Sequence, residues 1–283
     1  MKVKLLYVIL LFNVLACKQS EINSQSLEGK ILTSKTILFD QQIDDDIVSR
    51  PVIIETSANT DHLKSYPIVI ALHGRGGSNN NWVQPLSKFT NSGEFIGVYP
   101  QGHLNSWNLG QEPSTADDIA FISKIIDTLL SYSNVDENKI FAVGNSNGSG
   151  MVNVLGGVNK RLKAIAPVAS QLTERTEIKS NAIPHSVFQV NGDQDLLIPI
   201  VGGMKLGHPF LSASDSAKKW ATHFNCNHNV AVEEKEQTIL HTYSDCDDNV
   251  VVKYLVVKGA GHATARDYTS LWGDVWDFFS SLD

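Results

Sequence analysis

The chain has 283 residues, of which 42% are hydrophobic and 19% are charged, and this composition is ordinary for a globular protein. The formal net charge of −7 argues against nucleic acid or an anionic membrane surface as a partner. The length permits one large α/β domain or two small ones.

The N-terminus has the layout of a secretory signal peptide. Lys2 and Lys4 precede an apolar stretch, residues 5–16, that is too short to span a bilayer comfortably as a helix. The stretch ends in Val-Leu-Ala-Cys, which resembles the lipoprotein box of bacteria. We therefore expect residues 1–16 to be removed and Cys17 to carry a lipid. The alternative is an ordinary secretory signal with an incidental cysteine.

The segment after Cys17 is polar. Residues 18–30 contain no aromatic side chain, as expected of a tether that links a membrane anchor to a folded domain. We predict that residues 17–35 form this tether. The protein is then expected to be exported and held in a bacterial cell envelope, with no membrane contact apart from the lipid.

From residue 36 onward, short β-rich runs alternate with helical runs. Helical periodicity begins near Thr115 and recurs over residues 215–224 and 268–282. The alternation implies a mostly parallel sheet with helices on both faces, so residues 36–283 are predicted to form a single α/β domain. The predicted strands are residues 36–39, 52–55, 68–72, 95–99, 139–143, 162–168, 186–190 and 250–257.

One motif, Gly-Asn-Ser-Asn-Gly at residues 144–148, directly follows a predicted strand and precedes a predicted helix. In that context the motif is typical of a nucleophile elbow, a tight turn that exposes the hydroxyl of Ser146 and needs glycine on both sides. Asn147-Gly148-Ser149 also spells an N-glycosylation acceptor. The two interpretations exclude each other, because a glycan on Asn147 would cover the serine.

A serine becomes a useful nucleophile only when a histidine takes its proton and a carboxylate orients that histidine. In this fold the acid and the base follow the serine in that order, each at the end of a strand. Asp193 and Asp195 both follow the predicted strand 186–190, and His262 follows the strand 250–257 in a glycine-rich loop. The sequence therefore predicts His262 as the base, with either aspartate as its partner.

The oxyanion of acyl transfer needs preorganised backbone N–H donors. The amide of Asn147, the residue after the nucleophile, is one candidate, and the turn at residues 73–77 supplies a second, assigned to Arg75. The alternative is that this turn only ends a strand. Its glycines do not match a phosphate-binding loop, because no Gly-Lys-Ser/Thr follows them.

The three cysteines divide into Cys17 and a pair, Cys226 and Cys246. An even number in an exported protein makes a disulfide the default, and the bridge would close a loop of about 20 residues. A zinc site is the alternative, although the usual ligand spacings are not clean. Its other candidate ligands are His223, His228 and His241.

Two tryptophans, Trp82 and Trp107, are predicted in loops on the same side of the sheet as the serine. Each is a candidate to stack on a sugar or an aromatic group of a substrate. Packing inside the protein is the alternative for both. Trp220, Trp272 and Trp276 fall on predicted helices and are expected in the core.

Six segments, in chain order, carry a resemblance to a known family: LHGRGGSNNNW, VYPQG, DDIAFISKIID, VDENKIFAVGNSNGSGM, NGDQDLLIPIVGG and VKGAGH. Over roughly residues 50–282 the chain resembles secreted esterases related to polyhydroxybutyrate depolymerases and to feruloyl and acetylxylan esterases. The resemblance implies the α/β-hydrolase fold, a triad of Ser146, Asp195 and His262, and a disulfide between Cys226 and Cys246.

The chain departs from this family at two positions near the predicted site. Ala263 and its neighbours stand where Trp-Pro often follows the histidine, and Arg75 stands where the family often has cysteine or a small residue. Neither change touches the triad, but both alter the expected substrate surface.

These observations predict an exported serine carboxylic ester hydrolase, a monomer that needs no metal or organic cofactor. Its expected substrate is an ester, with feruloyl or acetyl groups on plant polysaccharide as the main prediction. The alternatives are a polyester depolymerase, a serine peptidase of the prolyl-oligopeptidase kind, and a non-catalytic glycan-binding lipoprotein.

Overall fold

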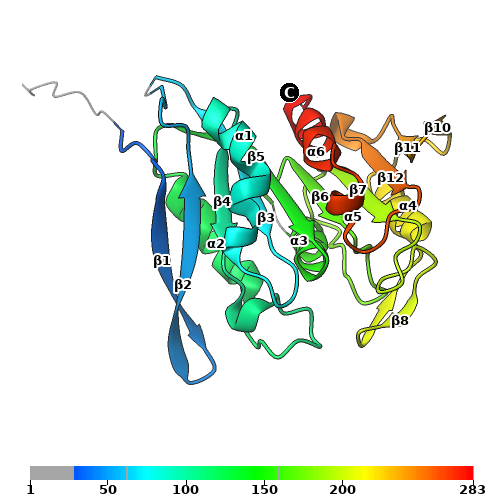
Figure 1. Cartoon of the computed structure of the whole chain (residues 1–283), viewed down its shortest axis with the longest axis horizontal. Coiled ribbons are helices and arrows are strands. Elements are labelled where there is room, and N and C mark those ends of the chain that lie inside the picture. Colours follow the sequence, from blue (N-terminus) through cyan, green and yellow to red (C-terminus); the bar gives the residue numbers. More distant parts are fainter. Residues whose placement is uncertain (1–28, 62, 159, 283) are drawn as a thin grey trace, which may run out of the picture.

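The computed structural model describes residues 29–61, 63–158 and 160–282 (Figure 1). The predicted signal peptide, the lipidation at Cys17 and most of the predicted tether lie outside these residues. Within them, no helix is long and apolar enough to cross a membrane.

The core of the molecule is a ten-stranded sheet in the order β1-β2-β4-β3-β5-β6-β7-β12-β11-β10. Its centre, from β4 to β12, is parallel, as predicted. A separate hairpin, β8–β9, completes the strands. In chain order they are β1 (Lys35–Ile43), β2 (Asp46–Glu55), β3 (Tyr66–Leu72), β4 (Ile96–Pro100), β5 (Val135–Asn145), β6 (Ala164–Val168), β7 (Ser186–Gly192), β8 (Gly203–Lys205), β9 (His208–Phe210), β10 (Val230–Glu234), β11 (Thr238–Tyr243) and β12 (Val252–Val257).

Helices cover both faces of the sheet, so two hydrophobic cores form. Side chains alternate along a strand, and in β3 Ile68 and Ile70 face one core while Val69 and Ala71 face the other. The first core receives α2, α3 and α4, and the second receives α1 and α6. The helices are α1 (Val83–Ser92), α2 (Asp118–Leu129), α3 (Asn147–Val158), α4 (Ala213–His223), α5 (Thr264–Asp267) and α6 (Leu271–Ser280).

The two edges of the sheet differ from the parallel centre. β1 and β2 form a long antiparallel hairpin at one edge, and β11 and β10 add an antiparallel pair at the other (Figure 1). The sequence analysis predicted neither β10 nor β11; all five residues of β10 are exposed, so burial imposes no apolar alternation on it. It also misses α1, where Pro85 lies in the first turn, a position that a helix tolerates.

The folded domain begins earlier than residue 36, so the predicted tether 17–35 is too long at its C-terminal end. Leu32 is fully buried in the first core. Its backbone N–H donates to Asn134 Oδ1 at 2.8 Å, and its carbonyl accepts from Asn134 Nδ2 at 3.0 Å. Residues 31–35 therefore belong to the domain.

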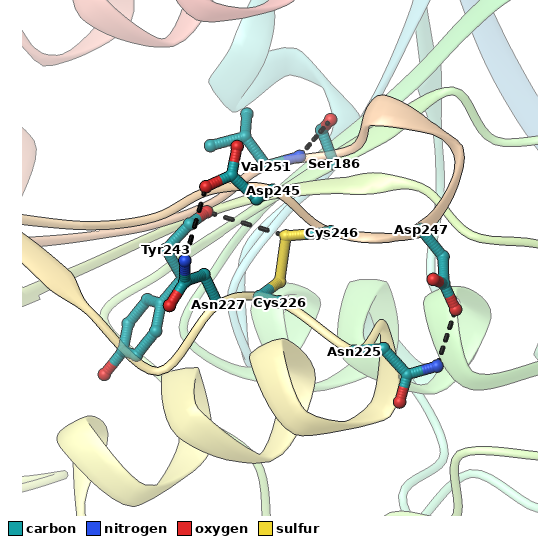
Figure 2. The surroundings of a disulfide bond; sticks show 9 residues. All are labelled: Ser186, Asn225, Cys226, Asn227, Tyr243, Asp245, Cys246, Asp247 and Val251. Atoms are coloured by element: carbon teal, nitrogen blue, oxygen red, sulfur yellow. Dashed lines mark hydrogen bonds between the residues drawn. A yellow bond between two sulfur atoms is a disulfide. The ribbon is translucent and has the colours of Figure 1, made fainter.

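The predicted disulfide is confirmed. Cys226, just after α4, is bonded to Cys246, which precedes β12, and the bond fastens that helix to the last strands of the sheet (Figure 2). A hydrogen bond of 2.6 Å from Asn225 Nδ2 to Asp247 Oδ2 joins the same two segments. Because both sulfurs are consumed in the bond, the zinc alternative is wrong.

Candidate active site

The motif at residues 144–148 forms a sharp turn between β5 and α3. Ser146 adopts a φ of 55°, a left-handed conformation that is uncommon for serine and is held here by tertiary contacts. Its N–H donates to Val168 O at 2.9 Å. A Cβ at Gly148 would lie 2.2 Å from Leu72 O, and one at Gly144 would lie 2.3 Å from Gly148 O. Both glycines are thus required by close backbone approach.

Three side chains from different strand ends meet at this turn. The Ser146 Oγ–H donates to His262 Nε2 at 2.8 Å, and the His262 Nδ1–H donates to Asp195 Oδ2 at 2.7 Å. The Asp195 side chain is 1% exposed, whereas that of His262 is 25% exposed. The carboxylate is thereby shielded from water while the histidine and serine remain accessible to a ligand.

The structure separates the two candidate aspartates. Asp195 Oδ1 accepts the N–H groups of Leu197 and Ile198 at 2.8 and 2.9 Å, which leaves Oδ2 for the histidine. Asp193 instead accepts the Gly259 N–H at 2.7 Å and stabilises the loop before His262. The carboxylate partner of His262 is therefore Asp195.

The turn after β3 lies directly against the serine. A Cβ at Gly74 would be 3.4 Å from the Ser146 Cβ, so the two turns are in van der Waals contact. Asn147 is the first residue of α3, where helical N–H groups have no intrahelical partner. In the described part of the chain, neither the Arg75 N–H nor the Asn147 N–H donates to another backbone group. These are the two predicted oxyanion donors.

A cleft of about 370 Å³ is lined by Asn145 and Ala263, the chain neighbours of Ser146 and His262. Arg75 and Arg266 lie on its lining, together with the aromatic rings of Trp82 and Trp272, whose centroids are 4.8 Å apart. Trp272 was expected in the core; it is half-buried, packs against the second core and also lines the cleft. Trp82 is 3% exposed, so little of its ring is accessible.

Comparison with known proteins finds relatives that are named as esterases. Feruloyl esterase B of Piromyces equi is 29% identical over 81% of this chain, and the bifunctional acetylxylan esterase/xylanase XynS20E of Neocallimastix patriciarum is 23% identical over 76%. The chain spans 44% and 31% of the lengths of these two relatives. No family model matches the chain.

Solved structures give the fold. The acetyl xylan esterase from Aspergillus awamori superposes with a TM-score of 0.57 at 14% identity, covering 84% of this chain and 98% of that enzyme. The chain has the α/β-hydrolase fold. The resemblance predicted from the sequence is therefore confirmed for the fold and for the named relatives.

Two of the roles considered for single residues do not fit the structure. Trp107 is fully buried, and its Nε1–H donates to His73 O at 2.8 Å, so it presents no face on which a ligand can stack. Asn147 is 8% exposed, and its side-chain amide pairs with both backbone polar groups of Trp107. It is not free to carry a glycan, so the glycosylation alternative is wrong.

Sequence reasoning missed the role of His73. Its Nδ1–H donates to Gly74 O at 2.8 Å, and its Nε2 accepts from the Gly102 N–H at 2.9 Å. Burial lowers the pKa of His73, so the ring is neutral at neutral pH and holds both bonds. The histidine therefore fixes the turn that carries Arg75. A histidine directly after a buried strand was the only signal.

Glu112 and His208 were also missed, because they are distant in sequence. Glu112 Oε1 accepts from His208 Nε2 at 3.0 Å, and both side chains are at most 5% exposed. The same oxygen lies 3.4 Å from Asn147 Nδ2. This pair docks the β8–β9 hairpin onto the loop before α2, beside the nucleophile turn.

Proposed function

We propose that this α/β-hydrolase is a serine carboxylic ester hydrolase that removes feruloyl or acetyl groups from plant polysaccharide. The observation that carries the proposal is the continuous pair of hydrogen bonds from Ser146 through His262 to Asp195. The feruloyl and acetylxylan esterases among its relatives support the choice of substrate.

The reaction follows from the positions of these groups. His262 Nε2 takes the hydroxyl proton as Ser146 Oγ attacks the ester carbonyl, and Asp195 stabilises the imidazolium that forms. The N–H groups of Arg75 and Asn147 bind the tetrahedral oxyanion. The imidazolium then protonates the leaving alcohol. A water molecule, deprotonated by His262, attacks the acyl-enzyme; the imidazolium returns the proton to Ser146 Oγ as the bond to the acyl group breaks and the acid is released.

The test compares Ser146→Ala with Ser149→Ala. Ser149 lies one turn further along α3, where its buried hydroxyl donates to Ser170 O, so its loss leaves the triad intact. Ser146→Ala is expected to abolish hydrolysis of p-nitrophenyl butyrate and labelling by a fluorophosphonate probe, while Ser149→Ala retains both. Full activity in Ser146→Ala would refute the proposal.

The ester class is tested with one purified sample on methyl ferulate, acetylated xylan and hydroxybutyrate oligomers. Higher kcat/KM on the first two supports the proposal. A preference for the oligomers indicates a polyester depolymerase, and faster cleavage of peptide amides than of esters indicates a peptidase.

We also propose that the protein is exported and anchored by a lipid on Cys17. Support comes from the basic residues, apolar stretch and terminal cysteine of the N-terminal segment. Mass spectrometry of the mature N-terminus is expected to show a lipid-modified cysteine, and Cys17→Ser is expected to release the protein from the membrane fraction. An unmodified N-terminus in the membrane-bound protein would refute the anchor.

A further inference from the structure

Trp107 joins the two segments that carry the proposed oxyanion donors. Its backbone N–H donates to Asn147 Oδ1 at 2.7 Å, and its carbonyl accepts from Asn147 Nδ2 at 3.0 Å. Its indole Nε1–H donates to His73 O at 2.8 Å, two residues before Arg75. One residue thus binds the start of α3 with its backbone and the turn after β3 with its side chain.

We propose that Trp107 is a positioning residue that fixes the distance between the Arg75 and Asn147 N–H groups. The proposal rests on the ester hydrolase function proposed above. These two donors lie on separate segments, one after β3 and one after β5. The paired strands and the contact between their turns bring the segments together, and Trp107 adds hydrogen bonds to both of them. Rigid placement matters because oxyanion donors lower the barrier only when they already point at the developing charge.

We call Trp107 and its hydrogen bonds to Asn147 and His73 the brace, and its surroundings are suited to holding the two segments in place. Trp107 is fully buried, so water does not compete for its three hydrogen bonds. The guanidinium of Arg50 lies 5.6 Å from the centroid of its ring, and Arg50 forms a buried ion pair of 2.7 Å with Asp118. Asp118 in turn accepts the Asn108 N–H at 2.7 Å. The residue that follows Trp107 is therefore anchored as well.

The position of Trp107 also explains the direction of the Asn147 side chain, the second asparagine of the nucleophile turn. The Asn147 side chain points away from the cleft and into the brace, whereas Asn145 lines the cleft. Asn147 thus contributes its side chain to positioning and its backbone N–H to the oxyanion. Loss of the brace is expected to reduce stabilisation of the transition state and to leave ground-state binding of the ester unchanged.

The experiment replaces Trp107 with phenylalanine, which keeps an aromatic ring and removes the indole N–H. We expect kcat to fall about 10- to 100-fold, less than the 10²- to 10³-fold loss typical of deleting a donor outright, with KM within about 2-fold of wild type. Affinity for a trifluoromethyl ketone, whose adduct with Ser146 bears an oxyanion, is expected to fall in parallel.

Trp220→Phe is the matched control. Trp220 is equally buried, but its indole N–H has no hydrogen-bond partner among the described residues, and its ring packs on His185 and Phe224. It is expected to keep wild-type kcat and ketone affinity even if its melting temperature falls.

A second variant, Asn147→Ala, keeps the backbone N–H at that position and frees Trp107 from the helix. It is expected to lower kcat as Trp107→Phe does, and the double variant should show less than the product of the two losses, since both break one brace. If Trp107→Phe fails to fold, Asn147→Ala by itself still tests the proposal.

The outcomes separate the two proposals. Wild-type kcat and ketone affinity in folded Trp107→Phe or in Asn147→Ala would overturn the positioning role. A raised KM with unchanged kcat would overturn it too. Full activity in Ser146→Ala would instead overturn the hydrolase function itself.

Discussion

The replacement Asp195→Asn tests the proposed triad most directly, because the structure dictates how the new amide must sit. Asp195 Oδ1 accepts two backbone N–H groups, from Leu197 and Ile198. Only an oxygen can take that place, so the amide NH₂ of the variant must face His262 Nδ1. A donor in that position forces Nδ1 to be the acceptor, and the ring proton moves to Nε2.

The consequence for catalysis follows from that proton. With Nε2 protonated, His262 donates toward Ser146 Oγ and has no lone pair there to accept the hydroxyl proton. The same substitution in a characterised serine protease triad lowers kcat by about 10⁴, which corresponds to about 5 kcal/mol in the barrier. We expect a loss of that order here, because the 2.7 Å and 2.8 Å contacts have the same arrangement.

The assay is hydrolysis of p-nitrophenyl acetate at pH 7, with kcat and KM measured separately. Asp193→Asn is the control, since its oxygen still accepts the Gly259 N–H, and it is expected to stay within about 3-fold of wild type. If Asp195→Asn retains more than a tenth of wild-type kcat, or if Asp193→Asn loses as much, the assignment of the acid is refuted.

Three further predictions concern the oxyanion turn, the disulfide and a buried histidine. Arg75→Pro, which lacks the N–H, is expected to lose about 10²- to 10³-fold in kcat/KM for p-nitrophenyl butyrate, while Arg75→Ala loses little; equal losses would contradict a backbone donor. Replacing Cys226 and Cys246 with alanine reopens a loop with a sequence separation of 20 and should lower the free energy of unfolding by about 3 kcal/mol in urea titrations; an unchanged midpoint would refute this. Burial lowers the pKa of His185 to about 4, so the folded state binds fewer protons than the unfolded state. The stability that the neutral His185 provides is present above about pH 6.5 and is lost as the pH falls. Between pH 7 and 4 the free energy of unfolding of wild type should therefore fall by about 3 kcal/mol more than that of His185→Leu. Parallel curves of unfolding free energy against pH would contradict this.

The sequence determined the fold and the main chemical groups of this protein. The parallel strands are continuous apolar runs, because both faces of the sheet are covered, and this signal is local. The nucleophile turn is local as well, since Gly144 and Gly148 must flank Ser146 within five residues. The order of serine, acid and histidine along the chain then indicated Ser146 and His262, and the family resemblance implied Asp195 as the acid.

Elements without an apolar pattern were not predictable in this way. Every residue of β10 is exposed, and the strand is held by pairing with β11, which is a tertiary contact. The early domain boundary depends on Leu32 meeting Asn134, about a hundred positions away. Nothing in the sequence around Leu32 or Asn134 indicates that these two residues are in contact.

Only the tertiary structure decided the roles of side chains whose partners are remote in sequence. The strand order alone left both Asp193 and Asp195 open, and the family resemblance favoured Asp195. The structure shows that Asp195 meets His262, with its other oxygen held by two backbone N–H groups. Trp107 has an aromatic ring that could stack on a substrate. In the structure the ring is buried, and the residue instead links Asn147 to His73 through hydrogen bonds. A residue type fixes what a side chain can donate, accept or cover, whereas the packing of distant segments fixes which of those capacities is used.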